Sequence, residues 1–179
     1  MYANQYSEIP AALASEARLR NHALVLVGRE PMPGKVTEGG ARLDDLRGLL
    51  TRVLEGRITP AEACAQVERA IPREESGHSA NNRVFPSGWG ERLVRTQVSR
   101  LYNQAVLELA LEDGIEEVFV PHSSEEEGTS ACTQLLAGGR HRTKELLDRL
   151  VRAYAQGDFS MKDPKIPHHP HCTHVVVPT

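Results

Sequence analysis

The sequence predicts a helix-rich α+β protein, with an N-terminal helical arm and a small C-terminal α+β domain whose short β-sheet is closed by a Cys/His tail. Apolar residues recur at intervals of three and four over several segments, which is the spacing of amphipathic helices. Only two short segments rich in valine indicate strands, and aromatic residues make up just 4% of the chain. A core built from Leu, Val and Ala suits helices. The length of 179 residues fits one domain, or a compact domain with a helical extension.

Residues 1–72 are expected to form the helical arm, which docks on a partner. A first helix is predicted over 9–27, because Pro10 suits a first helical turn and Leu13, Ala17 and Leu24 partly follow helical spacing. Two glycines and two prolines in 28–34 end it.

Two further helices are predicted before residue 72. The first covers 42–55, where Gly56 stands at the position of a C-terminal glycine. Its apolar stripe comprises Leu43, Leu46, Leu50, Val53 and Leu54. The second opens at Thr59, Pro60 and Glu62, which form a capping box with proline in the first turn.

A polar connector over 73–90 marks the predicted boundary to the C-terminal domain, residues 91–179. The elements predicted after it are a helix over 91–112, a strand over 115–121, a polar acidic loop over 123–130, a helix over 143–155 and a strand over 175–177. The two strands could pair in a small sheet, but neither register nor direction follows from the sequence.

Composition excludes several classes of protein. With 40% apolar and 25% charged residues, the chain resembles an average soluble globular protein rather than a disordered or fibrous one. We expect no membrane association, because no apolar run reaches about 18 residues and residues 1–6 lack the features of a secretory signal. Three cysteines are too few for a disulfide scaffold.

The strongest candidate site is the histidine-rich tail, since four of the eight histidines lie in the last twelve residues. His169, Cys172 and His174 offer imidazole and thiolate ligands of the kind that zinc prefers in a tetrahedral shell of four. Cys132 is the remote candidate for the fourth ligand. A structural zinc ion on these four residues would close a loop of roughly forty residues and staple a domain with a thin core.

Other interpretations of the tail remain open. It could be a solvated polar end, or Cys132 and Cys172 could form a disulfide outside a reducing cytosol. His122, His141 and His168 are substitute ligands, and His168 and His171 are otherwise expected to be bystanders. Cys64 lies on an apolar helix face and is expected to be a small core residue.

A catalytic use of the same residues would need an open metal position and a nearby base. Glu125, Glu126 and Glu127 could supply that carboxylate, although a run of three acids is more often a solvated loop. No metalloprotease, nucleophile-elbow or phosphate-loop motif occurs. Gly138 and Gly139 indicate a turn.

Charge is segmented along the chain although the net charge is only −3. Residues 112–127 hold acids and no base, whereas Arg92, Arg95 and Arg100 lie on one predicted helix. Such a basic face could contact DNA or a partner protein, although an ordinary solvated helix face is the preferred explanation.

Three segments of the C-terminal half occur in a recognisable order. Residues 95–105 begin with Arg-Thr-Gln, residues 130–138 carry Cys132 before two leucines and a glycine, and residues 169–174 read His-Pro-His-Cys-Thr-His before Val-Val-Val-Pro. Together they resemble the phage head morphogenesis family, the Mu-type minor head or minor capsid proteins. Gln97 replaces the family's usual Glu, Thr129 its first cysteine, and His174 its last.

This resemblance covers about half of the chain and implies a non-enzymatic structural virion protein. Such a protein acts in head morphogenesis near the portal, inside the phage head, and is assembled in the bacterial host cytoplasm. The expected partners are the portal or major capsid protein, further copies of the chain and genomic DNA during packaging or delivery. The rival hypotheses are a metal-dependent nuclease or peptidase that uses the Cys/His cluster, and a regulatory module that binds one protein.

Overall fold

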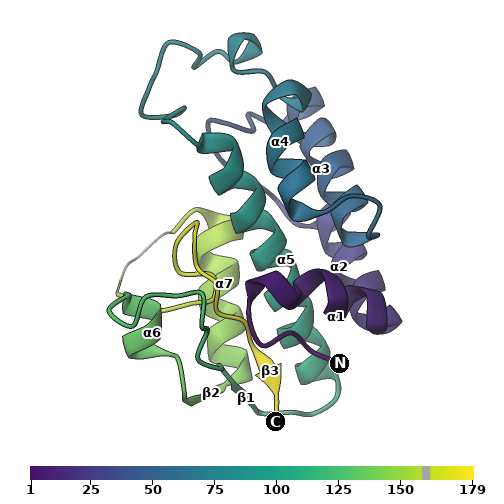
Figure 1. Ribbon diagram of the computed structural model, residues 1–179, viewed down its shortest axis with the longest axis vertical. Helices are drawn as coiled ribbons and strands as arrows, with labels where there is room; N and C mark the ends of the chain where they lie inside the picture. The colour runs from purple at the N-terminus through teal and green to yellow at the C-terminus, as the bar shows by residue number, and fades with distance from the viewer. Residues whose placement is uncertain (159–161) are drawn as a thin grey trace.

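The fold of the computed structural model, described here for residues 1–158 and 162–179, is built around one long helix, α5 (Trp89–Glu112). In Figure 1 α5 runs through the middle of the molecule, between the N-terminal helices and the C-terminal elements. The chain is rich in helix and carries a small antiparallel sheet, so the predicted α+β class is confirmed.

The N-terminal helices pack on one another and on α5. They are η1 (Tyr6–Glu8), α1 (Ile9–Ser15), α2 (Ala17–Arg29), α3 (Gly40–Leu54) and α4 (Pro60–Ala70). The single helix predicted over 9–27 is interrupted at Glu16, whose backbone is extended (φ −124°, ψ 95°) and whose carboxylate accepts a hydrogen bond from the backbone of Arg18. The break changes the phase of the helix, so Ala17 is exposed and Leu19 is buried.

The predictions for α3 and α4 are confirmed in detail. Leu46 and Leu50 are fully buried, and Thr59 and Glu62 form both hydrogen bonds of the capping box. Close contact of α4 with α5 depends on Gly90, because a Cβ atom there would lie 2.6 Å from Val67 Cγ1.

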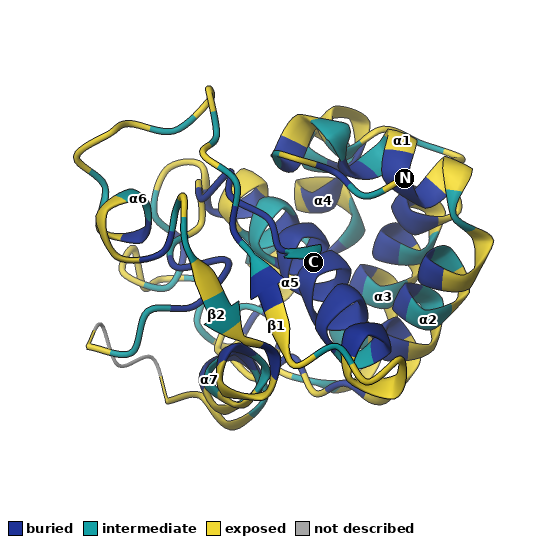
Figure 2. Cartoon of the chain, turned by 90° about the horizontal axis from the view of Figure 1, so that it is seen from below, coloured by how far each residue is buried: buried dark blue, intermediate teal, exposed yellow. Residues whose placement is uncertain are grey.

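Helix α5 is buried on all sides over residues 97–107, and not along one stripe as amphipathic spacing would require. Figure 2 shows it as a nearly continuous dark-blue element between the two parts of the fold. Polar side chains on it therefore need internal partners. Asn103 donates to the Ser99 carbonyl and accepts from the backbone N–H of Val176, which attaches the C-terminal chain to α5.

The C-terminal elements surround the other side of α5. They are β1 (Glu117–Phe119), α6 (Ala131–Leu135), β2 (Arg140–Arg142), α7 (Thr143–Gln156) and β3 (Val177–Pro178). The sheet has the order β2-β1-β3, with both pairs antiparallel and Val118 opposite His141 and Pro178. The predicted strands do pair, while α6 and β2 went unpredicted because each is too short to show a periodicity.

Both sides of the predicted connector at 73–90 contribute to one continuous hydrophobic core. The N-terminus also contacts the C-terminal part directly. Ala3 N donates to Tyr102 Oη at 2.8 Å, and Tyr6 N donates to the Thr173 carbonyl at 2.8 Å. The helical arm therefore packs against the rest of the fold, and its division from 91–179 stays a prediction.

Among the helices of the described residues, none combines the length and the apolar character that crossing a membrane requires.

Candidate metal centre

Cys132 lies at the start of α6, a short helix that begins after the acidic loop. Ser130 caps this helix by accepting a hydrogen bond from Thr133 N. The Cys132 side chain is buried, and its sulfur lies 3.3 Å from Ser130 Oγ. The cap therefore fixes where this sulfur points.

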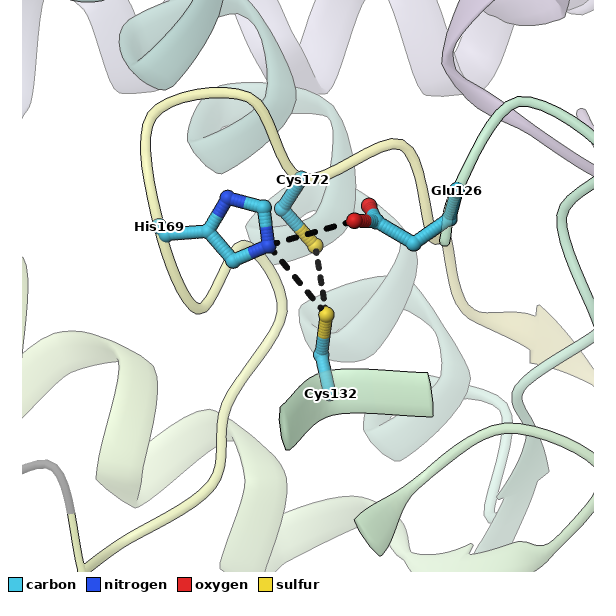
Figure 3. Close-up of side chains that lie close together, drawn as sticks. All are labelled: Glu126, Cys132, His169 and Cys172. Carbon is cyan, nitrogen blue, oxygen red and sulfur yellow. Dashed lines mark hydrogen bonds and ion pairs between the residues drawn. The ribbon is translucent and has the colours of Figure 1, made fainter. Parts of the chain in front are cut away.

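The tail folds back onto α6, as the sequence predicts. The tail turns between His169 and Cys172, where Cys172 N donates a hydrogen bond to the His169 carbonyl at 3.0 Å. This turn brings the two side chains to the same side of the tail. The Cys172 thiol donates to Cys132 Sγ across 3.8 Å, and His169 Nε2 lies 3.4 Å from the same sulfur. Figure 3 shows the three side chains converging from these two segments.

Glu126 is the fourth member of the cluster. It belongs to the loop between β1 and α6, and only 8% of its side chain is exposed. Its Oε1 lies 3.4 Å from His169 Nε2, while Oε2 accepts from Thr173 N at 2.9 Å. The carboxylate is thus held against the tail, whereas the neighbouring Glu125 and Glu127 are exposed.

These four residues could hold a metal ion, because one ligand atom from each lies within 4.8 Å of all the others. A tetrahedral zinc site separates two sulfurs by roughly 3.8 Å, sulfur and nitrogen by roughly 3.5 Å, and nitrogen and oxygen by roughly 3.4 Å. The corresponding separations here are 3.8, 3.4 and 3.4 Å. Three of the six donor pairs therefore stand at the separations of a tetrahedral site, and the other three pairs lie within 4.8 Å.

The electrostatics of the cluster favour a thiolate at Cys132. The hydrogen bond from Cys172 is the main influence that lowers the pKa of Cys132, and His169 and His174 add to it. The same hydrogen bond, with burial, raises the pKa of Cys172. The bond to Cys132 in turn raises the pKa of His169. The Cys132 sulfur thus lies between the Cys172 thiol and the His169 imidazole, and binding of a divalent cation would release the protons that these groups carry.

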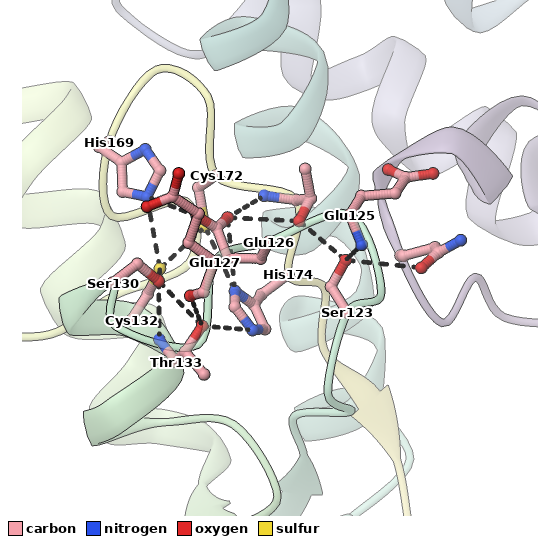
Figure 4. Close-up of polar contacts among 12 residues, drawn as sticks. Ser123, Glu125, Glu126, Glu127, Ser130, Cys132, Thr133, His169, Cys172 and His174 are labelled. Carbon is pink, nitrogen blue, oxygen red and sulfur yellow. Dashed lines mark hydrogen bonds and ion pairs between the residues drawn. The ribbon is translucent and has the colours of Figure 1, made fainter.

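His174, predicted as a ligand, lies beside this set rather than in it. Its Nδ1 is 4.0 Å from Cys172 Sγ and 3.8 Å from Glu126 Oε2, and its Nε2 is 3.4 Å from Thr133 Oγ1. The ring is fully buried between these partners, as Figure 4 shows. The group of ligand atoms that lie together thus includes Glu126, whereas His174 lies next to that group and stays a predicted ligand.

The other interpretations of the tail fare differently. A solvated end is wrong, since Cys172, Thr173 and His174 are buried. Cys132 and Cys172 are free cysteines in this structure rather than a disulfide.

The remaining histidines lie outside the cluster. His141 Nε2 bonds to the Leu136 carbonyl at 2.8 Å, and His122 and His171 are exposed. His168 is buried in the tail, and burial lowers its pKa. Cys64 is half-buried against the core, and burial raises its pKa.

The predicted basic face of α5 does not exist as one surface. Arg100 is fully buried and pairs with Glu30 across 3.3 Å, so it cannot contact DNA from this position. Arg95 is half-buried, with its guanidinium 4.4 Å from the centre of the Tyr6 ring. Only Arg92 is exposed. Spacing alone could not reveal this, because α5 is covered on all sides.

The acidic run gave no sequence signal that distinguishes Glu126 from its neighbours. Only its position shortly before Cys132 in the chain hinted that it could join the same cluster.

No family model, curated protein or solved structure matches the chain. The cluster therefore has to be interpreted from its own chemistry.

Proposed function

We propose that the chain is a structural, non-enzymatic minor head protein of a phage, and that a zinc ion bound by Cys132, His169, Cys172 and Glu126 closes its C-terminal region. The observation that carries the proposal is the convergence of the tail on Cys132, because the same residues form the last two of the three ordered segments that resemble the minor head family. The helix with the first segment, α5, holds the chain that follows the third segment through the hydrogen bond from Val176 N to Asn103.

Zinc is the ion that this donor set favours. Two thiolates and an imidazole are soft and borderline ligands that select zinc over magnesium or calcium, and one carboxylate commonly completes such a shell. The backbone of His168 and His174 lowers the pKa of Cys172, although the hydrogen bond to Cys132 and burial outweigh it. When bound, zinc would supply a cross-link between the tail and α6.

A structural role fits the cluster better than a catalytic one. All four positions of a tetrahedron are taken by protein side chains, whereas a catalytic zinc keeps a position for water. Glu126, the carboxylate that a hydrolase would need as a base, already accepts hydrogen bonds from the backbone and the hydroxyl of Thr173. The rival hydrolase would therefore lack both an open site and a free base.

In this proposal the partners are the portal or major capsid protein and further copies of the chain, in the interior of the phage head. Arg92 is the one arginine of the predicted basic face that can still reach DNA.

Metal analysis of the purified protein tests the zinc centre. We expect one zinc per chain in the wild type and none after Cys172→Ser. Glu126→Gln should weaken zinc binding at least tenfold, while the matched control Glu127→Gln, one residue away and exposed, should not. His174→Ala separates the two candidates for the fourth ligand, since it should retain zinc. Zinc-free wild-type protein, or a loss with His174→Ala that matches the loss with Glu126→Gln, would contradict the assignment.

Particle fractionation tests the role in the head. In cells that produce phage particles encoding this chain, the protein should sediment with DNA-filled heads and remain with them after tails are removed. A deletion should yield heads with impaired assembly or genome delivery. Protein that stays wholly in the soluble fraction while heads form normally would favour a regulatory module instead.

A further inference from the structure

A cavity of about 380 Å³ lies next to the tail and shares only His169 with the metal cluster. Its walls come from the loop at 33–37, residues 83–86, the first half of α5, Tyr154 of α7 and tail residues 168–170. Apolar side chains dominate the lining, among them Val36, Val84 and Trp89. Trp89 is only 8% exposed and packs edge-on against Phe85. The site is thus an apolar hollow between five segments.

The rim of this cavity is basic. Lys35, Arg83 and Arg92 are exposed residues that line it, and no Asp or Glu belongs to its described lining. Within residues 1–158 and 162–179, none of these three side chains takes part in an ion pair. Three unpaired cations around an apolar hollow favour an occupant that is apolar in the middle and acidic around it.

His168 supplies a second, independent observation. Its side chain lies in the wall of the cavity and the residue is 5% exposed, yet neither ring nitrogen has a hydrogen-bond partner among the described residues. A buried polar group without a partner is costly, and such groups are uncommon in folded proteins. An occupant with a polar group beside its apolar part could supply the missing hydrogen bond.

We propose that this cavity binds an acidic segment of a partner protein, which inserts one large apolar side chain and places its flanking carboxylates beside Lys35, Arg83 and Arg92. The volume is near the lower end of that of small-molecule sites, roughly 300–1,000 Å³, and accommodates about one large side chain. The cations lie on separate segments of the rim, so a chain that crosses the hollow can meet them in turn. The inference goes beyond the proposed function, since it does not depend on whether that partner belongs to a phage head.

Trp89 is the only tryptophan of the chain, so its fluorescence reports occupancy directly. The probes are blocked pentapeptides Glu-Glu-X-Glu-Glu with Phe, Leu, Met or Ile as X. We expect a saturable change in emission with at least one probe, and weaker binding as salt rises from 50 to about 200 mM because the charges are exposed. The peptide Lys-Lys-X-Lys-Lys with the same X should not bind.

Charge reversal locates the binding. Lys35→Glu combined with Arg83→Glu should weaken binding at least tenfold and leave folding intact, because both side chains are exposed and unpaired. Arg140→Glu, which makes a single reversal on the exposed edge strand β2, should leave binding unchanged. Circular dichroism and thermal unfolding confirm that each variant is folded.

Three outcomes would overturn the inference. The first is no saturable change with any of the four acidic probes at millimolar concentration. The second is equal binding to the wild type and to the doubly reversed variant. The third is binding of N-acetylphenylalanine alone as tight as that of the Phe peptide, which would identify a small-molecule pocket. Because zinc analysis and particle fractionation use different readouts, failure here is distinguishable from failure of the proposed function.

Discussion

The two sides of α5 are stabilised in different ways. The N-terminal side consists of helices of up to 15 residues that bury rows of leucines, and two of them, α2 and α4, have side-chain N-caps. The C-terminal side, apart from α7, consists of strands of two or three residues, a five-residue helix and long connections. There apolar residues such as Val118 and Val176 join the core, and a cluster of polar and sulfur-containing side chains around Cys132 also links remote segments.

The difference shows what short elements require. A strand or helix of a few residues buries too little apolar surface to offset the conformational entropy lost on ordering it. A cross-link between distant segments reduces that cost by restricting the unfolded chain. The cluster of Glu126, Cys132, His169 and Cys172 stands where the C-terminal side needs such a link, and the helical side needs none.

Removal of the proposed zinc ion should cause the largest loss of stability, and only the C-terminal side of α5 should be affected. With a chelator, we expect faster proteolysis within 113–142 and in the tail, and a lower melting temperature, because structural zinc contributes to folding free energy. Most of the helical circular dichroism should persist. Limited proteolysis with and without chelator measures this, and Cys172→Ser should reproduce the chelated pattern while His171→Ala should not. Equally fast proteolysis of the N-terminal and C-terminal sides of α5 after chelation would contradict the difference in how the two sides are stabilised.

The buried ion pair between Arg100 and Glu30 should give the next largest effect. Glu30→Ala leaves the guanidinium buried without its carboxylate, which typically costs about 3–5 kcal/mol. Denaturant unfolding measures the loss. Because Arg100 connects α5 to the end of α2, zinc content should be unchanged. The double variant Glu30→Met with Arg100→Met should recover most of the stability, and a double variant as unstable as Glu30→Ala would contradict this account.

The capping box of α4 should contribute less. Thr59→Ala removes the acceptor for the backbone N–H of Glu62 and is expected to lower the free energy of unfolding by about 1 kcal/mol. Thr59→Asp keeps an acceptor at the same place and should stay close to the wild type. The measurement is the denaturation midpoint at a constant slope. A loss of equal size in both variants would show that the methyl group, and not the cap, matters.

The smallest predicted effect is the pH dependence of stability that Glu108 contributes. Burial alone would raise the pKa of Glu108, but hydrogen bonds from Gln104, His22 and Arg29 together hold it below the ordinary value of 4.5. A lowered pKa stabilises the fold above that value, and the contribution disappears as the pH falls through the folded-state pKa. Glu108→Gln should therefore be less stable than the wild type at pH 7, with a gap that narrows below about pH 4. A gap that does not change with pH would contradict this origin.

Local signals in the sequence were sufficient for α3 and α4, but not for α1 and α2. The capping box at Thr59 and the stripe with Leu46 and Leu50 predicted α4 and α3, because helix caps and amphipathic faces depend on residues within one or two turns. The interruption at Glu16 escaped prediction, because no glycine or proline marks it in the sequence. The predicted face through Ala17 was wrong for that reason.

The candidate site was only half predictable. The residue types of Cys132, His169 and Cys172 indicated a metal site, and the tail contacts α6 as predicted. The choice between His174 and Glu126 depended on where the rings and the acidic loop lie after folding.

By itself, then, the sequence determined the class of the fold, most helices and three of the four cluster residues, because periodicity, capping and ligand chemistry are properties of residues and their near neighbours. Only the tertiary structure decided that α5 is buried on all sides, that Arg100 is an internal charge rather than a DNA contact, and that Glu126 completes the cluster. Those outcomes depend on which segments far apart in the chain pack together, and burial and proximity of that kind leave no periodic trace in the sequence.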